Sequence, residues 1–272
     1  MKIISTFNDK IYEFSGKDMI KTVRQYMPEV EIQVYVEFKK EKNRKELEKM
    51  GVRVINADSV PQRKEVWESN LDIITKPYGG KAPKEDKKCN SGWNRRWFGW
   101  FQKVIAQHHS NVEEDYDDYI IFLDSDCRLL KGLSRKFLRE TTQGKAVSFF
   151  KGMRPAIESG VIIVDCASQF SKQFYSHFMS LFTTKQFRKF NRWDDGYVLT
   201  RAIYGEGGFG NGVPASMNPT QNLCDIAEGL RAPKSWTNSN GYETGGQIIS
   251  QTDWNKYIEH DKGTHGRNSV VK

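Results

Sequence analysis

Two acidic residues, Asp124 and Asp126, follow directly on the apolar run Tyr119-Ile-Ile-Phe-Leu123. The aromatic and β-branched residues of this run predict a buried strand of a parallel sheet. Because a charged group is costly inside a sheet, both carboxylates are expected at its carboxyl edge, where open α/β sheets bind ligands. Two carboxylate ligands suit Mg²⁺ or Mn²⁺, and phosphate oxygens commonly complete the coordination of such a cation. The run therefore predicts a metal site that also binds a diphosphate.

A second acidic pair, Asp115 and Asp117, lies a few residues upstream. It belongs to the acidic segment 113–118, whose charge predicts a solvated loop that leads into the strand. An Asp-x-Asp pattern thus arises easily by chance, and a pair without metal remains the alternative for Asp124 and Asp126. The preceding strand is what favours metal binding at the later pair.

The composition predicts one folded domain and leaves the class of partner open. The 272 residues are 38% hydrophobic and 12% aromatic, which is enough for the core of one large α/β domain. Four cysteines occur without a Cys-x-x-Cys pair, which argues against a zinc site or a disulfide framework and favours a reducing cytoplasm. A net charge of +8 allows a polyanionic partner such as DNA without showing one. No apolar run approaches the roughly 18 residues of a membrane span, and the first residues lack a signal-peptide pattern.

Hydrophobic periodicity predicts alternating strands and helices over the first half of the chain. Strands are expected over 2–7, 31–38, 52–55 and 119–126, and helices over 16–27, 41–50, 61–70 and 95–109. The second half is expected to hold two neighbouring strands, 146–150 and 160–164, and two helices, 167–183 and 195–204. Loops are predicted over 76–92, 205–212 and 237–246. This order predicts an α/β fold, a single domain over 1–272 with a central, mostly parallel sheet flanked by helices.

Two adjacent acids, Asp194 and Asp195, stand at the start of the predicted helix 195–204. Asp194 suits the N-cap, which leaves Asp195 available for chemistry, although a capping role for Asp195 remains the alternative. Upstream, Glu158-Ser-Gly160 precedes the strand 160–164, and glycine there would let the backbone approach a ligand closely. An ordinary turn is an equally good interpretation of that segment.

Two groups of residues are expected to have structural roles. Three tryptophans at helical spacing are interpreted as core residues in preference to base-stacking residues: Trp93, Trp97 and Trp100. Three histidines without a ligand pattern around them are interpreted as surface or hydrogen-bonded residues: His108, His109 and His177.

Taken together, the motifs resemble those of the GT-A class of nucleotide-sugar glycosyltransferases, in particular phage-type enzymes distantly similar to glycogenin-like retaining transferases. Each motif is weak by itself, and the resemblance depends on their order and spacing across nearly the whole chain. The five segments are Ser5-Thr-Phe-Asn8 with Tyr12, Asp124-Ser-Asp126, Glu158-Ser-Gly-Val161 with Asp165, Arg192-Trp-Asp-Asp-Gly-Tyr197, and Tyr257-Ile-Glu-His-Asp-Lys-Gly263. The resemblance implies a nucleotide-binding half, residues 1–126, and a half for sugar and acceptor, residues 127–272.

The resemblance also implies roles for individual residues. Asp124, Asp126 and His260 would hold Mn²⁺ (or Mg²⁺), since a histidine beside carboxylates favours manganese, with His265 as the other candidate for third ligand. The acids near the reacting carbon would be Asp195, Asp194 and Glu158. The donor would be bound by Thr6, Phe7, Asn8, Tyr12, Lys103, Asp124, Ser125, Ser159, Gly160, Lys262 and Gly263, with Phe7 or Tyr12 stacking on the base.

The sequence departs from the class at several positions. Gly99 stands where the class has an arginine four residues before Lys103, and Arg95 or Arg96 is expected to take its place. The acidic motif carries two acids, Asp194 and Asp195, where related sequences tend to carry one. The C-terminal motif continues as His265-Gly-Arg267, where the class has Lys-Pro-Trp.

The function implied by the resemblance is metal-dependent transfer of a sugar from a UDP-sugar, such as UDP-glucose, to an acceptor hydroxyl with retention. In a retaining enzyme Asp195 would stabilise positive charge at the reacting carbon, and in an inverting enzyme it would deprotonate the acceptor. The acceptor is open; modified DNA is consistent with the net charge, and the expected location is the cytoplasm, of a host cell if a phage encodes the protein.

Two other functions are alternatives. A nucleotidyltransferase shares a similar sheet and acidic pair, but it is expected to have a glycine-rich first turn, and residues 7–11 contain no glycine. A basic nucleic-acid-binding protein without catalysis predicts strongly salt-dependent DNA binding that is indifferent to loss of the Asp124 carboxylate.

Overall fold

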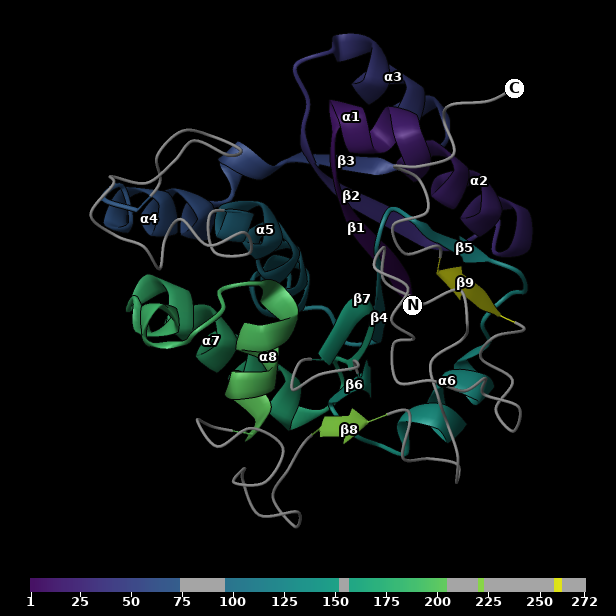
Figure 1. Ribbon diagram of the computed structural model, residues 1–272. Helices are drawn as coiled ribbons and strands as arrows, with labels where there is room; N and C mark the ends of the chain where they lie inside the picture. The colour runs from purple at the N-terminus through teal and green to yellow at the C-terminus, as the bar shows by residue number, and fades with distance from the viewer. Residues whose placement is uncertain (74–95, 152–156, 205–219, 223–256, 261–272) are drawn as a thin grey trace, which may run out of the picture.

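The computed structural model describes residues 1–73, 96–151, 157–204, 220–222 and 257–260, which form an α/β fold (Figure 1). The central sheet contains β1 (Lys2–Asn8), β2 (Glu31–Glu37), β3 (Arg53–Asn56), β4 (Tyr119–Leu123), β6 (Val147–Lys151), β7 (Ile157–Asp165) and β8 (Thr220–Asn222). The order of these strands is β3-β2-β1-β4-β7-β6-β8. Neighbours are parallel except at β7, which runs antiparallel to β4 and β6. The predicted mostly parallel sheet is confirmed.

The strand order creates a switch point between β1 and β4. From β1 the chain proceeds outward through β2 to β3, and β4 then pairs with the other side of β1. Connections on the two sides of such a point leave in opposite directions, so a crevice opens beyond the carboxyl ends of the two strands. Those ends are Asn8 and Leu123, and Asp124 and Asp126 therefore follow directly into the crevice.

Helices cover both faces of the sheet (Figure 1). On one face lie α4 (Pro61–Ser69), α5 (Trp97–His108), α7 (Gln169–Thr183) and α8 (Asp195–Tyr204). On the other lie α2 (Lys17–Tyr26), α3 (Glu41–Lys49) and α6 (Arg135–Thr142), whereas the short α1 (Asp9–Ile11), directly after β1, buries none of its residues. This arrangement is the three-layer solution that an α/β chain uses to bury both faces of a parallel sheet.

The central strand β4 shows why the sheet needs cover on both sides. Its residues Ile120 and Phe122 pack into the cluster that contains Trp97 of α5, whereas Ile121 and Leu123 pack into the cluster on the opposite face. All five residues of β4 are buried. Because both faces of β4 are covered, none of its side chains faces water. This explains why the sequence of the strand is a continuous apolar run without alternating polar residues.

Local sequence signals set the ends of several helices. Pro61 occupies the first turn of α4, where its missing N–H costs no hydrogen bond. Helix α3 ends before Gly51, whose φ of +71° lies in the left-handed region that glycine adopts without strain. Ser168 caps α7, because its hydroxyl accepts a hydrogen bond from the N–H of Phe170 at 3.4 Å.

A small second sheet pairs two distant segments. Strands β5 (Cys127–Leu129) and β9 (Ile258–His260) are antiparallel, and Cys127 stands opposite His260 in the register. Because Cys127 follows Asp126, the pairing brings the backbone of a C-terminal segment to the end of the segment Asp124-Ser-Asp126.

The predicted elements differ from the observed ones in a few places. The strand predicted over 160–164 begins earlier, at Ile157, because residues 157 and 158 continue the pairing with β6 beyond a bulge at Phe149/Phe150. The short elements α6, β5, β8 and β9 were not predicted from periodicity. The predicted loops 76–92, 205–212 and 237–246 lie outside the described residues. None of the described helices combines the length and the apolarity needed to cross a membrane.

Candidate active site

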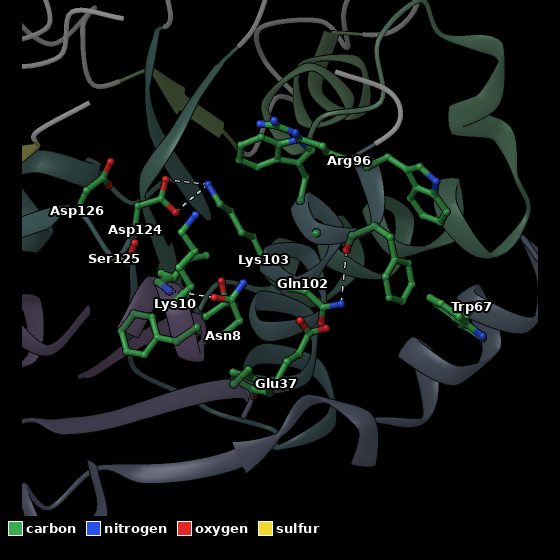
Figure 2. Close-up of a pocket in the computed structure, with 18 of the residues that line it drawn as sticks. Asn8, Lys10, Glu37, Trp67, Arg96, Gln102, Lys103, Asp124, Ser125 and Asp126 are labelled. Carbon is green, nitrogen blue, oxygen red and sulfur yellow. Dashed lines mark hydrogen bonds and ion pairs between the residues drawn. The ribbon is translucent and has the colours of Figure 1, made fainter. Parts of the chain in front are cut away.

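A cavity of about 590 Å³ opens at the switch point between β1 and β4. Figure 2 shows the carboxylates of Asp124 and Asp126 at one end of it and Trp67 at the other. Seven of the residues predicted for the site line it: Thr6, Phe7, Asn8, Lys103, Asp124, Ser125 and Asp126. The sheet edge therefore gathers residues from β1, from α5 and from the segment after β4 into one site.

Lys103 of α5 is buried and joins two of the predicted acids. Its Nζ lies 2.7 Å from the carboxylate of Asp124 (Figure 2) and 3.4 Å from Oδ2 of Asp195. Burial disfavours the charged ammonium, but the attraction of Asp124, Asp195 and Asp126 outweighs it and raises the pKa of Lys103 above its ordinary value. A permanent positive charge therefore lies between the end of β4 and the start of α8.

The two adjacent acids at the start of α8 have different surroundings. Asp194 is the N-cap, because its Oδ1 accepts a hydrogen bond from the N–H of Tyr197 at 3.2 Å and its Oδ2 accepts one from Arg192 at 2.9 Å. Burial raises the pKa of Asp194, with Arg192 opposing that effect. Asp195 is 5% exposed and points to Lys103 instead. The predicted cap is confirmed, and Asp195, which is not among the described residues that line the cavity, is the acid that contacts Lys103.

Close packing of α8 on β7 sets the position of Asp195. A Cβ at Gly196 would lie 2.4 Å from the carbonyl oxygen of Ile157, well inside van der Waals contact. The hydroxyl of Thr200 also accepts a hydrogen bond from the N–H of Ile157 at 2.8 Å. The missing side chain at Gly196 therefore lets the first turn of α8 lie against β7, with Asp195 beside Lys103.

The segment Glu158-Ser-Gly160 contacts the acidic pair through its backbone. It belongs to β7 and is not a turn, and the N–H of Asp124 donates to the carbonyl of Gly160 at 2.8 Å. Glu158 is buried, and its Oε1 accepts a hydrogen bond from the N–H of Gly160 at 3.2 Å. The described lining of the cavity contains none of the three residues, and the contact with Asp124 is made by the carbonyl of Gly160.

Strand β9 places the backbone of His260 beside the residue that follows Asp126. The described part of the chain holds no group of three or more His, Cys, Asp or Glu residues able to bind a metal. Asp124 and Asp126 nevertheless fit a magnesium-type or manganese-type site, in which one or two carboxylates bind the cation and phosphate and water supply the rest. The remaining C-terminal residues predicted for the site lie outside the described residues: Lys262, Gly263 and His265.

The two aromatic residues predicted to stack on a base have different positions. Phe7 lines the cavity, although it is only 3% exposed. Tyr12 has no exposed surface, and its ring centroid lies 6.0 Å from that of Phe7 and 5.5 Å from that of Phe38. Tyr12 therefore belongs to the core and is not among the described residues that line the cavity, and its contact with a nucleotide stays a prediction.

Helix α5 follows the predicted pattern except at Trp100. Gly99 leaves open space, since nothing lies within 4 Å of a Cβ built there, and Arg96 lines the cavity one turn earlier. Trp97 is a core residue as predicted, at 2% exposure. Trp100 is not, because it faces the cavity with Nζ of Lys103 5.4 Å from its ring centroid. Arg95 and Trp93 lie outside the described residues.

Sequence reasoning missed a polar group at the centre of the cavity wall. Glu37, at the end of β2, and Gln102 of α5 both line the cavity. Arg63 of α4 binds both, with Nη2 at 2.5 Å from Oε1 of Glu37 and Nε at 3.2 Å from Oε1 of Gln102. Burial raises the pKa of Glu37, with Arg63 opposing it. The feature of the sequence that could have indicated this group is Glu37, an acidic residue at the carboxyl end of β2, which lies next to β1.

The residues expected to have structural roles largely do so. Asp115 is exposed on the loop before β4 and pairs with Lys172. The Nδ1 of His109 lies 2.8 Å from the hydroxyl of Tyr35, and burial lowers the pKa of His109. His177 is exposed. The upstream acidic pair is thus separate from the cavity.

No protein-family model matches the sequence, and no curated protein is significantly similar to it. Mouse xyloside xylosyltransferase 1 in its apo form is similar with a TM-score of 0.47 and 12% identity, over 74% of this chain and 81% of that chain. The bifunctional glycosyltransferase WbbM gives 0.48 and 10% over 82% of this chain and 38% of that one. The galactosyltransferase LgtC, in complex with donor and acceptor sugar analogues, gives 0.44 and 14% over 74% and 70%. These three solved structures are between 10% and 14% identical to this chain, and their TM-scores all lie below 0.5.

Proposed function

We propose that this protein is a metal-dependent glycosyltransferase that moves a sugar from a nucleotide sugar, most simply a UDP-sugar, to an acceptor hydroxyl. The observation that carries the proposal is the double contact of Lys103 with Asp124 and Asp195. Through this contact Lys103 connects two acids at the switch point of the sheet. Asp124, at the end of β4, is suited to bind a cation and phosphate, and Asp195 is a buried acid suited to stabilise positive charge.

The charged end of the cavity suits the diphosphate of such a donor. Asp124 and Asp126 would hold the divalent cation, and the backbone position of His260 beside Cys127 is consistent with a third ligand. The bound cation would neutralise negative charge on the leaving diphosphate. Lys103 adds a fixed positive charge at the same end of the cavity, where charge that develops during bond cleavage is stabilised without reorganisation.

Asp195 is suited to stabilise positive charge at the anomeric carbon, the carbon of the sugar that reacts. The bond between the anomeric carbon and the phosphate oxygen breaks as the bond to the acceptor oxygen forms, and the carbon gains positive charge in between. In the retaining form of the reaction the acceptor proton passes to an oxygen of the leaving diphosphate. Asp195 then acts as an anion that stabilises the carbon, and Lys103 holds its carboxylate in place.

The first experiment measures release of nucleoside diphosphate from a panel of nucleotide sugars with Mn²⁺. We expect wild-type activity to fall about a hundredfold in Asp124→Asn and in Asp126→Asn, because each loses a charged ligand of the cation. Asp117→Asn is the matched control, since it removes a carboxylate of the exposed upstream pair. Failure of the wild-type protein to release diphosphate from any donor would sink the proposal.

The products distinguish the alternative enzyme class and the stereochemistry. A nucleotidyltransferase would release pyrophosphate from a nucleoside triphosphate and would leave nucleotide sugars intact. With an active donor, NMR of the product formed on simple glycan hydroxyls and on hydroxylated DNA identifies the acceptor and the anomeric configuration. Retention is expected, and an inverted product would assign Asp195 the role of general base.

A further inference from the structure

The cavity has a charged end and an aromatic end. Asp124, Asp126 and Lys103 lie at the charged end. At the other end Trp67 and Phe98 contact each other edge to face, with ring centroids 4.8 Å apart. A nucleotide has the same polarity, with charged phosphates at one end and a flat base at the other. If the phosphates occupy the charged end, as the proposed function requires, the base lies toward the aromatic end.

Glu37 and Gln102 lie between these ends (Figure 2). They come from different elements, β2 and α5, and Arg63 of α4 connects them. Arg63 is itself largely covered, with 13% of its side chain exposed, and its Cζ lies 5.0 Å from the ring centroid of Phe98. The polar pair is therefore held from behind by a guanidinium that does not line the cavity.

The contact with Arg63 fixes the direction of both groups. A guanidinium can only donate, so the amide oxygen of Gln102 must face Arg63 and the amide NH₂ must point elsewhere. One of its two hydrogens points to the carbonyl of Phe98 at 3.4 Å, and the second is a further donor. A carboxylate has about four acceptor positions, and the bond from Arg63 to Glu37 uses one of them.

We propose that Glu37 and Gln102, held in place by Arg63, recognise the base of the bound nucleotide and favour bases whose ring carries an N–H beside a carbonyl, namely uracil and guanine. The ring N–H donates to Glu37, and the neighbouring carbonyl accepts from Gln102. Adenine and cytosine carry an unprotonated ring nitrogen at that edge, and its lone pair would face the carboxylate. The inference rests on the proposed function, because only a nucleotide with its phosphates at Asp124 presents its base here.

Binding of UDP, GDP, CDP and ADP to the full-length protein with Mn²⁺, measured by titration calorimetry, tests the inference. The wild-type protein is expected to bind UDP or GDP about tenfold or more tightly than CDP and ADP, the discrimination typical of a paired hydrogen-bond contact with a base edge. Glu37→Gln is expected to reduce that preference to about threefold or less, because the new amide can both donate and accept. Gln102→Leu keeps the Glu37–Arg63 pair intact and is expected to weaken the same preference.

Two further variants separate recognition from folding. Arg63→Met touches no ligand but releases the amide of Gln102, so it is expected to relax base preference while leaving the affinity for inorganic pyrophosphate unchanged. Glu48→Gln, on the exposed side of α3, is the matched control. An unaltered base preference in folded Glu37→Gln and Gln102→Leu, or a wild-type protein that binds all four nucleotides equally, overturns this inference alone. A wild-type protein that binds no nucleotide overturns the proposed function with it.

Discussion

At the scale of single residues, Lys103 is the centre of the site. Most lysines keep the ammonium in water, but here Nζ is buried within 3.4 Å of two carboxylates, those of Asp124 and Asp195. Each charge offsets the cost of burying the others, so the three form one unit and not three separate features. The sequence identified all three residues but offered no reason to join them.

Replacement of Lys103 tests this unit. We expect Lys103→Met to lower the free energy of unfolding by about 3 kcal/mol, because Asp195 becomes a buried charge without a counterion. The raised pKa keeps Lys103 charged throughout the neutral range, so chemical denaturation at neutral pH measures the full effect. The double variant Lys103→Met/Asp195→Asn should recover part of the loss. If the losses of the two single variants simply add, the residues are not coupled.

At the scale of elements, the contact between α8 and β7 decides where Asp195 lies. Helix propensity and the cap at Asp194 account for the start of α8 but not for its distance from the sheet. That distance depends on Gly196, whose position admits no Cβ next to the carbonyl of Ile157. From the sequence alone, a glycine in the first turn of a helix could have several roles. Only the packing of α8 against β7 shows that Gly196 is needed because there is no room for a side chain.

Gly196→Ala is expected to destabilise the protein by about 1–3 kcal/mol, since α8 must move away from β7 to make room for the methyl group. The same shift displaces Asp195, and a displacement near 1 Å costs activity about a hundredfold. Thermal melts and diphosphate release measure the two effects. Gly99→Ala is the control, because nothing lies within 4 Å of a Cβ placed at that position. The free energy of unfolding should therefore rise by about 1 kcal/mol, from the higher helix propensity of alanine. Equal effects of the two substitutions would contradict the packing argument.

At the scale of the whole molecule, Asp118 connects three separate parts of the chain. Its carboxylate accepts hydrogen bonds from the N-terminal ammonium of Met1, at 2.5 Å, and from Arg135 of α6, at 2.6 Å, just before β4 begins. Burial alone would raise the pKa of Asp118, but the bonds from Arg135 and the N-terminus outweigh it and hold that pKa well below its ordinary value. The pair of contacts ties Met1, which precedes β1, and Arg135, the first residue of α6, to the same carboxylate.

The depressed pKa predicts a specific pH dependence of stability. A carboxyl group with a lowered folded-state pKa stabilises the fold above its unfolded pKa, about 4, and this contribution is lost as the pH falls further. Asp118→Asn should therefore cost about 1 kcal/mol at neutral pH and progressively less in acid. Melting temperatures of both proteins from neutral to acidic pH are expected to converge. A constant difference across that range would show that Asp118 acts by packing.

The sequence by itself determined the elements and most of the acidic site. Runs such as Tyr119–Leu123 are buried on both faces and must be apolar, so the strand, the sheet type and the placement of Asp124 and Asp126 at its carboxyl edge followed from periodicity and the cost of burying charge. Short elements such as β5 and α6 were not predicted, because a few residues contain too little hydrophobic periodicity to be recognised as a strand or a helix.

Only the tertiary structure decided which side chains meet. Tyr12 stands beside the nucleotide motif in sequence yet lies in the core, whereas Arg63, which no motif marks, holds Glu37 and Gln102 at the cavity wall. The direction of a side chain depends on how helices rotate and pack against the sheet, and these contacts join residues far apart in the chain. Charges such as Lys103 are tolerated inside only when packing brings their partners to them, and that information is not present in any local stretch of sequence.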